Sequence, residues 1–372
     1  MAVPRAIVGV LVVAFIGTFG ALYVASRTPR FADREIVAPE AWRALQRQDA
    51  ERAASLFNDA LKERPNDPVL HLGIGSAAYA LGKTEAALRA LQKAVALDPE
   101  FAEAQIMLGQ VAYARGDSAL AIRSMEKAAT IRPGDSEVRD SLDRWRHESS
   151  VHGGYLERPS EHFRVLYEGG TQQSVGERVV RTLEREHGRI GRILNTSPDA
   201  TLTVVLYTDR DFQDITRSPS WAAGNYDGRI RIAVGGTIPA GDLERVATHE
   251  LVHAFVASAA PRRVPAWLNE GLASYLESSD HTWAPAVIRQ AGSIVPLESL
   301  VDGFNGLNAQ QAMAAYAESA IAAEILCKLL GANVGAFLRT IGGGASVDQA
   351  LLEFQVQPNA FHAEWRRRVG LQ

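Results

Sequence analysis

The segment THELVHAFV, residues 248–256, places two histidines four residues apart, with a glutamate directly after the first. At about 100° per residue, a helix turns His249 and His253 to within about 40° of each other, with Glu250 about 60° further round. Two imidazoles on one helical face can bind one divalent metal ion, and the adjacent carboxylate can act as a general base on water. The spacing therefore predicts part of a hydrolytic metal site.

The rest of this predicted helix is apolar on nearly every side, which is typical of a buried helix. Its apolar residues are Leu243, Val246, Leu251, Val252, Phe255 and Val256. Buried histidines and a buried glutamate without partners would destabilise the fold by several kcal/mol, and a bound cation would remove that penalty. We therefore expect a metal ion here rather than an ordinary core helix.

A third metal ligand is predicted seventeen residues beyond His253, in PAWLNEGLASYLE, residues 265–277. If the first helix ends near Ala259, it extends about 9 Å past His253, and a returning helix covers a similar distance before Glu270. An antiparallel helical hairpin thus sets Glu270 level with the two histidines. Three protein ligands leave one corner of a tetrahedral zinc ion open, as catalytic sites do, and Ser274 is a candidate to hydrogen-bond a ligand.

A closed structural zinc site would need a fourth protein ligand, and none has the spacing for it. The remaining histidines are expected to be surface or hydrogen-bonded residues: 71, 147, 152, 162, 187, 281 and 362. The single cysteine, Cys327, is interpreted as a small buried apolar residue, so we expect no disulfide within the chain.

The pattern HExxH followed by WLNEGLA resembles the gluzincin zinc metallopeptidases, most closely the bacterial peptidase MA-like domains, over residues 161–368. The segments that carry the resemblance are HFRVLYEG, GNYDGRIRI, HELVHAF, PAWLNEGLASYLE, YAESAIAAEIL and FHAEW. The resemblance implies one Zn²⁺ per chain, with His249, His253 and Glu270 as ligands and Glu250 as base and proton shuttle. It also implies a zincin-like domain over residues 161–372 that hydrolyses protein or peptide substrates.

Two further parts of the site follow from the resemblance. In gluzincins a strand at the sheet edge, beside the active-site helix, pairs with the substrate backbone, and RIRIAV, residues 229–234, is the candidate here. A tyrosine or histidine supports the oxyanion, and Tyr316 is the first candidate, ahead of Tyr226 and Tyr275. The alternative for Tyr316 is an ordinary core aromatic on a helix.

The elements around the predicted metal site combine strands and helices. Residues 163–169 and 201–208 are β-branched and apolar, with turn residues on either side, and are predicted as strands. Residues 174–194 between them have helical periodicity, residues 229–234 alternate as a short strand after a turn, and the chain from residue 239 is mostly helical. Strands followed by helices predict an α+β domain.

Residues 34–135 repeat with a period of 34, as the prolines at 65, 99 and 133 show. Small and large residues keep the same period in the sets Ala53, Ala87 and Ala121, and Phe57, Leu91 and Met125. This pattern resembles the tetratricopeptide repeat. We predict an all-α solenoid of three repeats, 34–67, 68–101 and 102–135, of which the first is a degenerate cap. A closing helix and a linker follow over residues 136–160.

Stacked repeats offer a concave surface, so we expect the array to bind a protein substrate or an adaptor. The alternative is a catalytically silent scaffold, in which the repeats carry the function and the zinc-binding domain is a relic. A net charge of −4 without a basic cluster argues against a nucleic-acid partner.

The N-terminus contains twenty residues without a charge, positions 6–25, which is about the length that spans a bilayer core as a helix. We predict a transmembrane signal-anchor over residues 1–30, which attaches the protein to the membrane and places its soluble part outside the cytoplasm, for instance in the periplasm. The alternative is a cleaved signal peptide.

Overall fold

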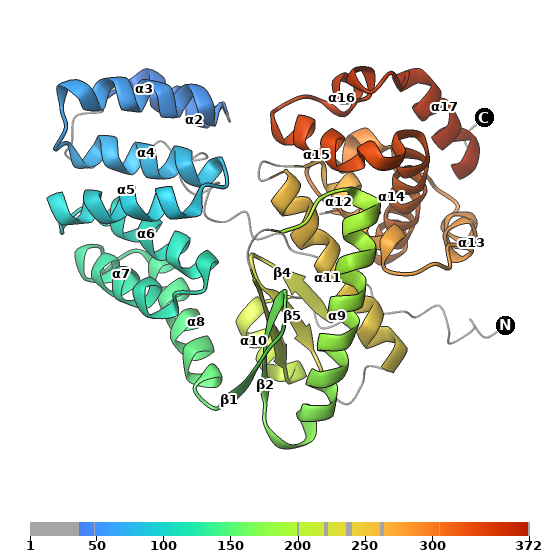
Figure 1. The fold of residues 1–372 in the computed structure, drawn as a ribbon, viewed down its shortest axis with the longest axis horizontal. Coiled ribbons are helices and arrows are strands. Elements are labelled where there is room, and N and C mark those ends of the chain that lie inside the picture. Colours follow the sequence, from blue (N-terminus) through green and yellow to red (C-terminus); the bar gives the residue numbers. More distant parts are fainter. Residues whose placement is uncertain are drawn as a thin grey trace. The chain divides into compact units, whose positions relative to one another are not determined.

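The computed structural model describes residues 37–370, apart from positions 48, 199–200, 219–221, 236–239, 261–263 and 305. The predicted signal-anchor lies outside the described residues. The chain divides into two compact units, one that ends at Gly154 and one that comprises Tyr155–Gln372, and Figure 1 labels their elements.

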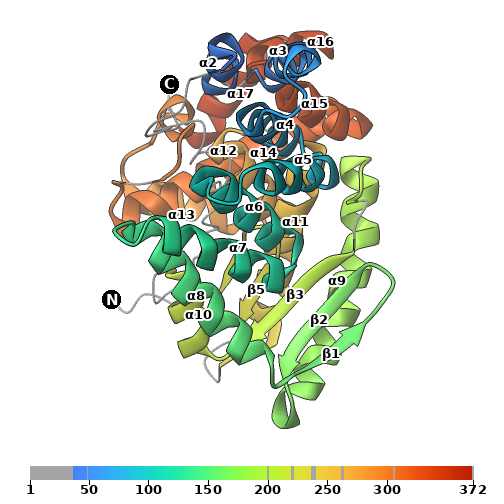
Figure 2. The ribbon, with the colours of Figure 1, turned by 90° about the vertical axis from the view of Figure 1, so that its left-hand side faces the viewer.

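The first unit consists of three helix pairs and a closing helix, layered one after another in Figure 2. The pairs are α2 (Pro39–Gln46) with α3 (Ala50–Glu63), α4 (Pro68–Ala80) with α5 (Thr84–Leu97), and α6 (Ala102–Arg115) with α7 (Ser118–Ile131), and α8 (Ser136–His152) closes the series. The predicted period of 34 residues is confirmed, since each pair occupies one repeat.

Close packing of small residues explains why the period is kept. Ala53, Ala87 and Ala121 are fully buried where the two helices of each pair meet. Tyr113 of α6 stacks on Trp145 of α8, with ring centroids 4.4 Å apart, so the closing helix shields the last repeat.

The boundary between the units differs from the predicted one at residue 161. Residues expected to be a linker form strand β1 (Tyr155–Pro159), which pairs antiparallel with β2 (Phe163–Glu168). This pairing satisfies backbone groups that β2 would otherwise leave unpaired at the edge of the sheet. The linker prediction was wrong here because the polar residues Glu157 and Arg158 occupy an exposed edge strand, where polar residues are tolerated.

The second unit contains a five-stranded mixed sheet in the order β1-β2-β3-β5-β4. The remaining strands are β3 (Leu202–Tyr207), β4 (Gly224–Tyr226) and β5 (Ile230–Ala233). Strands β2, β3 and β5 are parallel, and β4 pairs antiparallel with β5. The strands predicted near residues 163, 201 and 229 are therefore present.

The prediction that residues 229–234 form the sheet edge was wrong. β5 lies between β3 and β4, so both of its sides are paired, and the edge strand at this end of the sheet is β4. After Gly224–Tyr226 the chain reverses at Asp227 and Gly228, where Gly228 adopts φ +100, and β5 then runs back along β4. These three residues have too short an apolar pattern to predict a strand.

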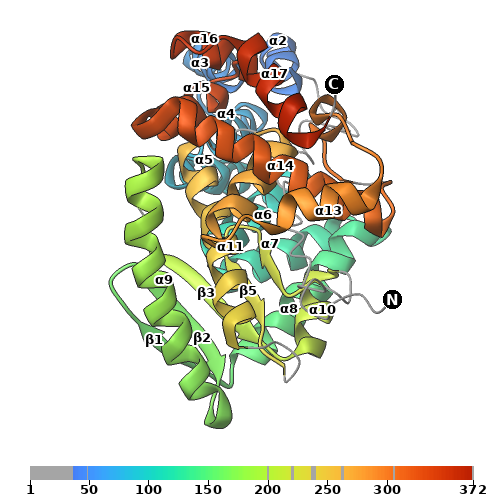
Figure 3. The same cartoon turned by 90° about the vertical axis from the view of Figure 1, so that its right-hand side faces the viewer.

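One face of the sheet packs against α9 (Gln173–Leu194) and α11 (Ala240–Ala259), which lie beside it in Figure 3. Alternate residues of the strands supply the apolar surface: Phe163, Val165, Val204, Leu206, Ile230 and Ile232. α10 (Asp209–Thr216) contacts β3 and β5. The helix that carries the two predicted histidine ligands is thereby held against β5 and β4, at one end of the sheet.

The C-terminal part is helical: α12 (Ala266–Leu276), α13 (Trp283–Ala291), α14 (Ala309–Leu330), α15 (Val334–Gly342), α16 (Val347–Glu353) and α17 (Pro358–Val369). Short 3₁₀ turns, η1 (Gly170–Gln172), η2 (Leu297–Leu300) and η3 (Gly331–Asn333), connect elements of this unit. Within the described residues, one run, Ala309–Gly342, is long and apolar enough to cross a membrane. Because 56% of its most apolar window is buried in the protein, it also fits the core helix of this unit.

Candidate metal centre

Helices α11 and α12 bring the three predicted ligands together. Donor atoms of His249, His253 and Glu270 all lie within 4.8 Å of one another. The Oε2 atom of Glu270 is 3.5 Å from Nε2 of His249 and 3.8 Å from Nε2 of His253. One ion at the centre of this triangle can therefore contact a donor from each residue.

The residues of the donor set are buried, and several of their donor atoms lack a hydrogen-bond partner among the described residues. His249 and His253 are each 1% exposed and Glu270 is 5% exposed. Nε2 of His249, both ring nitrogens of His253 and Oε2 of Glu270 have no hydrogen-bond partner among the described residues. Orphaned buried polar atoms are rare in native proteins, and three of these, one from each residue, lie close enough together to share a bound cation.

Glu250 lies beside this donor set, fully buried on α11. Neither carboxylate oxygen has a hydrogen-bond partner in the described part of the chain. Burial, with the charges of Glu270 and Glu277 nearby, raises the pKa of Glu250 to about 8 despite the opposing effect of His249. An unpaired carboxyl group that takes up a proton near neutral pH can act as a general base and acid.

Gly224 of the edge strand β4 leaves the space that Glu250 occupies. A Cβ atom at position 224 would overlap the carboxylate of Glu250, closer than any van der Waals contact allows. The absence of a side chain at this position therefore lets the edge strand approach the metal centre.

Sequence analysis missed Glu277, the residue that orients His249. Oε2 of Glu277 lies 2.6 Å from Nδ1 of His249, and its Oε1 accepts a 2.8 Å hydrogen bond from Arg245. The hydrogen bond at Nδ1 directs the Nε2 lone pair of His249 towards His253 and Glu270. Ser274, also buried on α12, stays a prediction for a hydrogen bond to a ligand.

The spacing between Glu270 and Glu277 in the sequence could have identified Glu277. It follows Glu270 by seven residues, which is about two helical turns and returns it to the same face of the helix. Because Glu277 meets Arg245 and His249 while Glu270 meets His249 and His253, α12 runs antiparallel to α11. The hairpin predicted from the sequence is antiparallel as well.

The charges of the centre are strongly coupled. Burial by itself lowers the pKa of His249, but the carboxylates of Glu270 and Glu277 outweigh it and raise the pKa to about 10. Burial would raise the pKa of Glu277, yet its bonds with His249 and Arg245 lower it overall. Glu277 thus stays ionised and remains an acceptor for His249.

Tyr316 of α14 lies in the same neighbourhood, as proposed for the oxyanion group. It is 6% exposed, and its ring meets Phe304 edge-on with centroids 4.7 Å apart. Burial, followed by the charges of the carboxylates at the centre, raises its pKa well above the usual value, so the phenol keeps its proton. Tyr226 lies on the edge strand, whereas Tyr275 packs against His281.

Two contacts hold α12 in position. A Cβ at Gly271 would collide with the Ser319 carbonyl, so this glycine permits the close packing of α12 on α14. At the other end, Arg189 of α9 donates a hydrogen bond to the Leu276 carbonyl, next to Glu277. The helix with the third ligand is therefore fixed from both sides.

A second group of possible ligand atoms comprises Glu161, His162 and Glu184. Nδ1 of His162 already lies 2.7 Å from Oε2 of Glu184, and its ring stacks on His187 at 3.8 Å. Glu161 is exposed, and His162 and Glu184 are only partly buried. We interpret this group as a histidine–carboxylate pair at the surface, in line with the prediction for His162.

Replacing Glu277 with alanine should weaken divalent metal binding by about 10- to 100-fold, because His249 loses the acceptor that orients it. Competition with a coloured chelator would measure the affinity, and circular dichroism would verify folding. Glu298→Ala, at an exposed glutamate, is the matched control. Equal affinities of the two variants would contradict the supporting role of Glu277.

Comparison with known proteins identifies the repeats. Family models of the tetratricopeptide repeat match residues 44–94 and 72–136. The crystal structure of the Sgt2 TPR domain from Aspergillus fumigatus matches 33% of this chain and 83% of its own length, with 21% identity and a TM-score of 0.31. The search of curated proteins found no match. The predicted tetratricopeptide repeats are confirmed, and they support a role in protein interaction.

Proposed function

We propose that this protein is a zinc-dependent peptide hydrolase whose tetratricopeptide repeats bind the protein substrate or an adaptor. The observation that carries the proposal is the convergence of His249, His253 and Glu270, with unpaired buried donor atoms, beside the unpaired carboxylate of Glu250. The resemblance of the HExxH and WLNEGLA segments to gluzincin peptidases supports the same conclusion.

The donor chemistry favours zinc. Two imidazole nitrogens and one carboxylate are a ligand set that zinc accepts in catalytic sites, whereas calcium and magnesium prefer oxygen ligands only. The set is completed by Glu277, which orients one histidine through Nδ1. A zinc ion held here would act as a Lewis acid on the scissile carbonyl and lower the pKa of a water molecule.

The residues around the donor set have separate roles in the proposed hydrolysis. Glu250 accepts a proton as the oxygen of water bonds to the carbonyl carbon, and delivers this proton to the nitrogen as the C–N bond breaks. Tyr316, which keeps its phenolic proton, is the candidate to donate a hydrogen bond to the carbonyl oxygen as negative charge develops there.

Substrate orientation is assigned to the edge strand β4 in place of β5. Its backbone borders the sheet next to α11, and Gly224 brings it against Glu250. An extended peptide added along this edge would pass the donor set with its backbone held by hydrogen bonds. The predicted signal-anchor would attach this activity to a membrane surface.

The second candidate function is a protein-interaction scaffold without catalysis. It is favoured by the comparisons, because both family models match within residues 44–136. On this hypothesis the repeats bind partners and the second unit has no turnover. Substitution of Glu250 separates the two candidate functions, because it lowers activity only if the protein is a hydrolase.

Zinc should stabilise the protein because it removes the penalty of the unpaired buried donors. At 100 times the dissociation constant, a ligand adds about 2.7 kcal/mol to the unfolding free energy. For a unit of about 200 residues, this raises the melting temperature by about 5–10 °C. Differential scanning fluorimetry with zinc or with chelator would measure the shift. A shift of the same size in His253→Asn would rule out this site as its origin.

Replacement of Glu250 with glutamine should lower kcat by about 10²- to 10⁴-fold, because glutamine cannot carry the proton. Hydrolysis of an unfolded protein substrate and zinc content per chain are measured together, and zinc content should stay at the wild-type level. Wild-type turnover in this variant, or none in either protein after zinc loading, would favour the scaffold hypothesis.

Gly224→Ala should lower kcat at least about tenfold while zinc remains bound, because the new methyl group displaces the base that hydrolysis requires. Steady-state kinetics and zinc titration test this, with Gly188→Ala, at an open position of α9, as the control. Unchanged kcat would show that the position of Glu250 beside β4 does not matter for turnover.

A further inference from the structure

Strand β4 directs one side chain to the face of the sheet that borders the metal centre. Tyr226 lies opposite Ile230 of β5, and Gly224 lies two residues earlier, so both share one face of the sheet. That face packs against α11, because Ile230 belongs to the same apolar core as α11 and a Cβ atom at Gly224 would meet Glu250. Tyr226 is therefore the side chain of β4 that lies on the side of the proposed base.

The hydrogen-bond ladder between β4 and β5 directs the backbone of Gly224 to the outer edge of the sheet. The N–H group of Ala233 donates to the carbonyl of Ala223, which makes this a hydrogen-bonded pair. Hydrogen-bonded and non-hydrogen-bonded pairs alternate along an antiparallel ladder, so Gly224 is in a non-hydrogen-bonded pair with β5. An extended peptide added at this edge would thus pair with Gly224.

The pleat of the sheet fixes which substrate side chains meet Tyr226. Residues opposite each other on adjacent strands carry their side chains on the same face, with Cβ atoms about 4.5–5.5 Å apart. The substrate residue opposite Tyr226 would therefore lie beside its ring, two residues from the one opposite Gly224. The residue between these two points to the other face and does not meet the ring.

The two faces of β4 differ in polarity. Tyr226 is partly buried and packs against the apolar core of the second unit. On the opposite face, Asn225 pairs with Arg231, and both side chains are buried and polar. Aromatic rings form favourable cross-strand pairs with aromatic and β-branched side chains. The face with Tyr226 therefore favours substrate side chains of these two kinds.

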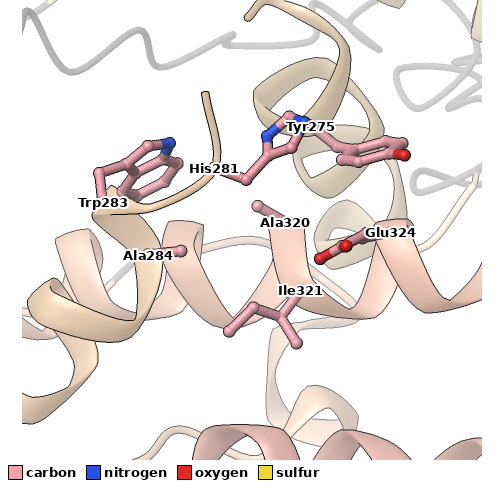
Figure 4. A pocket seen from close by; sticks show the side chains of 7 residues that line it. All are labelled: Tyr275, His281, Trp283, Ala284, Ala320, Ile321 and Glu324. Atoms are coloured by element: carbon pink, nitrogen blue, oxygen red, sulfur yellow. The ribbon is translucent and has the colours of Figure 1, made fainter. Parts of the chain in front are cut away.

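The pocket between α12, α13 and α14 gives no second place for such a side chain. Figure 4 shows its lining, which includes Tyr275, His281 and Glu324. Its cavity volume is about 10 Å³, which is roughly the space of one water molecule. A substrate side chain requires far more room, so we do not assign this pocket to the substrate.

We propose that Tyr226 determines substrate specificity, by selecting peptides with an aromatic or β-branched residue at the position that pairs with it. The ring acts through contact with the substrate, and its hydroxyl group takes no part in the reaction. The inference rests on the proposed function, because it requires a peptide at the edge of β4.

Peptides that differ only in the place of a single phenylalanine, in a chain of alanine and serine, test this selection. The zinc-loaded full chain should cleave them at a constant distance from the phenylalanine, because the peptide binds in the register that places this ring beside Tyr226. Relative to the peptide without phenylalanine, kcat/KM should rise severalfold, up to about fivefold. Mass spectrometry of the products locates the cleaved bond. Cleavage at bonds unrelated to the phenylalanine would overturn the proposal and leave the proposed hydrolysis intact.

Two substitutions at one position separate the ring from its hydroxyl group. Tyr226→Ala should lose both the constant distance and the gain in kcat/KM, whereas Tyr226→Phe should keep both. Zinc affinity and melting temperature are measured for each variant and should match the wild type. A preference that survives Tyr226→Ala, or a kcat that falls tenfold or more in Tyr226→Phe, would contradict the proposed role of the ring.

A binding measurement distinguishes failure of this inference from failure of the proposed function. Zinc-loaded Glu250→Gln should bind the phenylalanine peptides severalfold tighter than the peptide without phenylalanine, as isothermal titration would show. The difference should disappear when Tyr226→Ala is added. If it does so although the wild type cleaves no peptide, the specificity of the edge stands and hydrolysis fails. Equal binding of all peptides to Glu250→Gln would overturn the role of Tyr226.

Discussion

The burial of charged and titratable donors on two packed helices is the interaction on which the second unit depends. Nε2 of His249, the ring nitrogens of His253 and Oε2 of Glu270 have no hydrogen-bond partner among the described residues, and neither have the carboxylate oxygens of Glu250 beside them. Such groups strongly destabilise a core unless a cation is bound, because each has lost its hydration. The fold must hold these unpaired buried groups in fixed positions, and the elements around them do so.

The sheet and the neighbouring helices supply this rigidity. α11 is held against the parallel strands by a continuous apolar surface, and α12 packs on α14 through Gly271. Glu277 joins the two helices through Arg245 and His249, so the first ligand cannot rotate without breaking a buried hydrogen bond. Preorganised donors of this kind bind metal more tightly than donors that must first be ordered.

The repeat unit is stabilised in a different way. Each repeat buries small and large side chains between successive helices, so its contacts are mostly between neighbours in the chain. The confirmed tetratricopeptide repeats suggest binding to protein partners, which agrees with the proposed action on proteins.

The sequence by itself determined what depends on local periodicity. The 34-residue period located the repeats, and helical spacing brought His249, His253 and Glu270 to one point, because both follow from fixed rise and rotation per residue. Tertiary structure alone decided that β4 rather than β5 is the sheet edge and that residues 155–159 pair as a strand. It also brought Tyr275, His281 and Glu324 around one pocket. Strand order and the meeting of separate helices depend on contacts between distant segments, which no local pattern encodes.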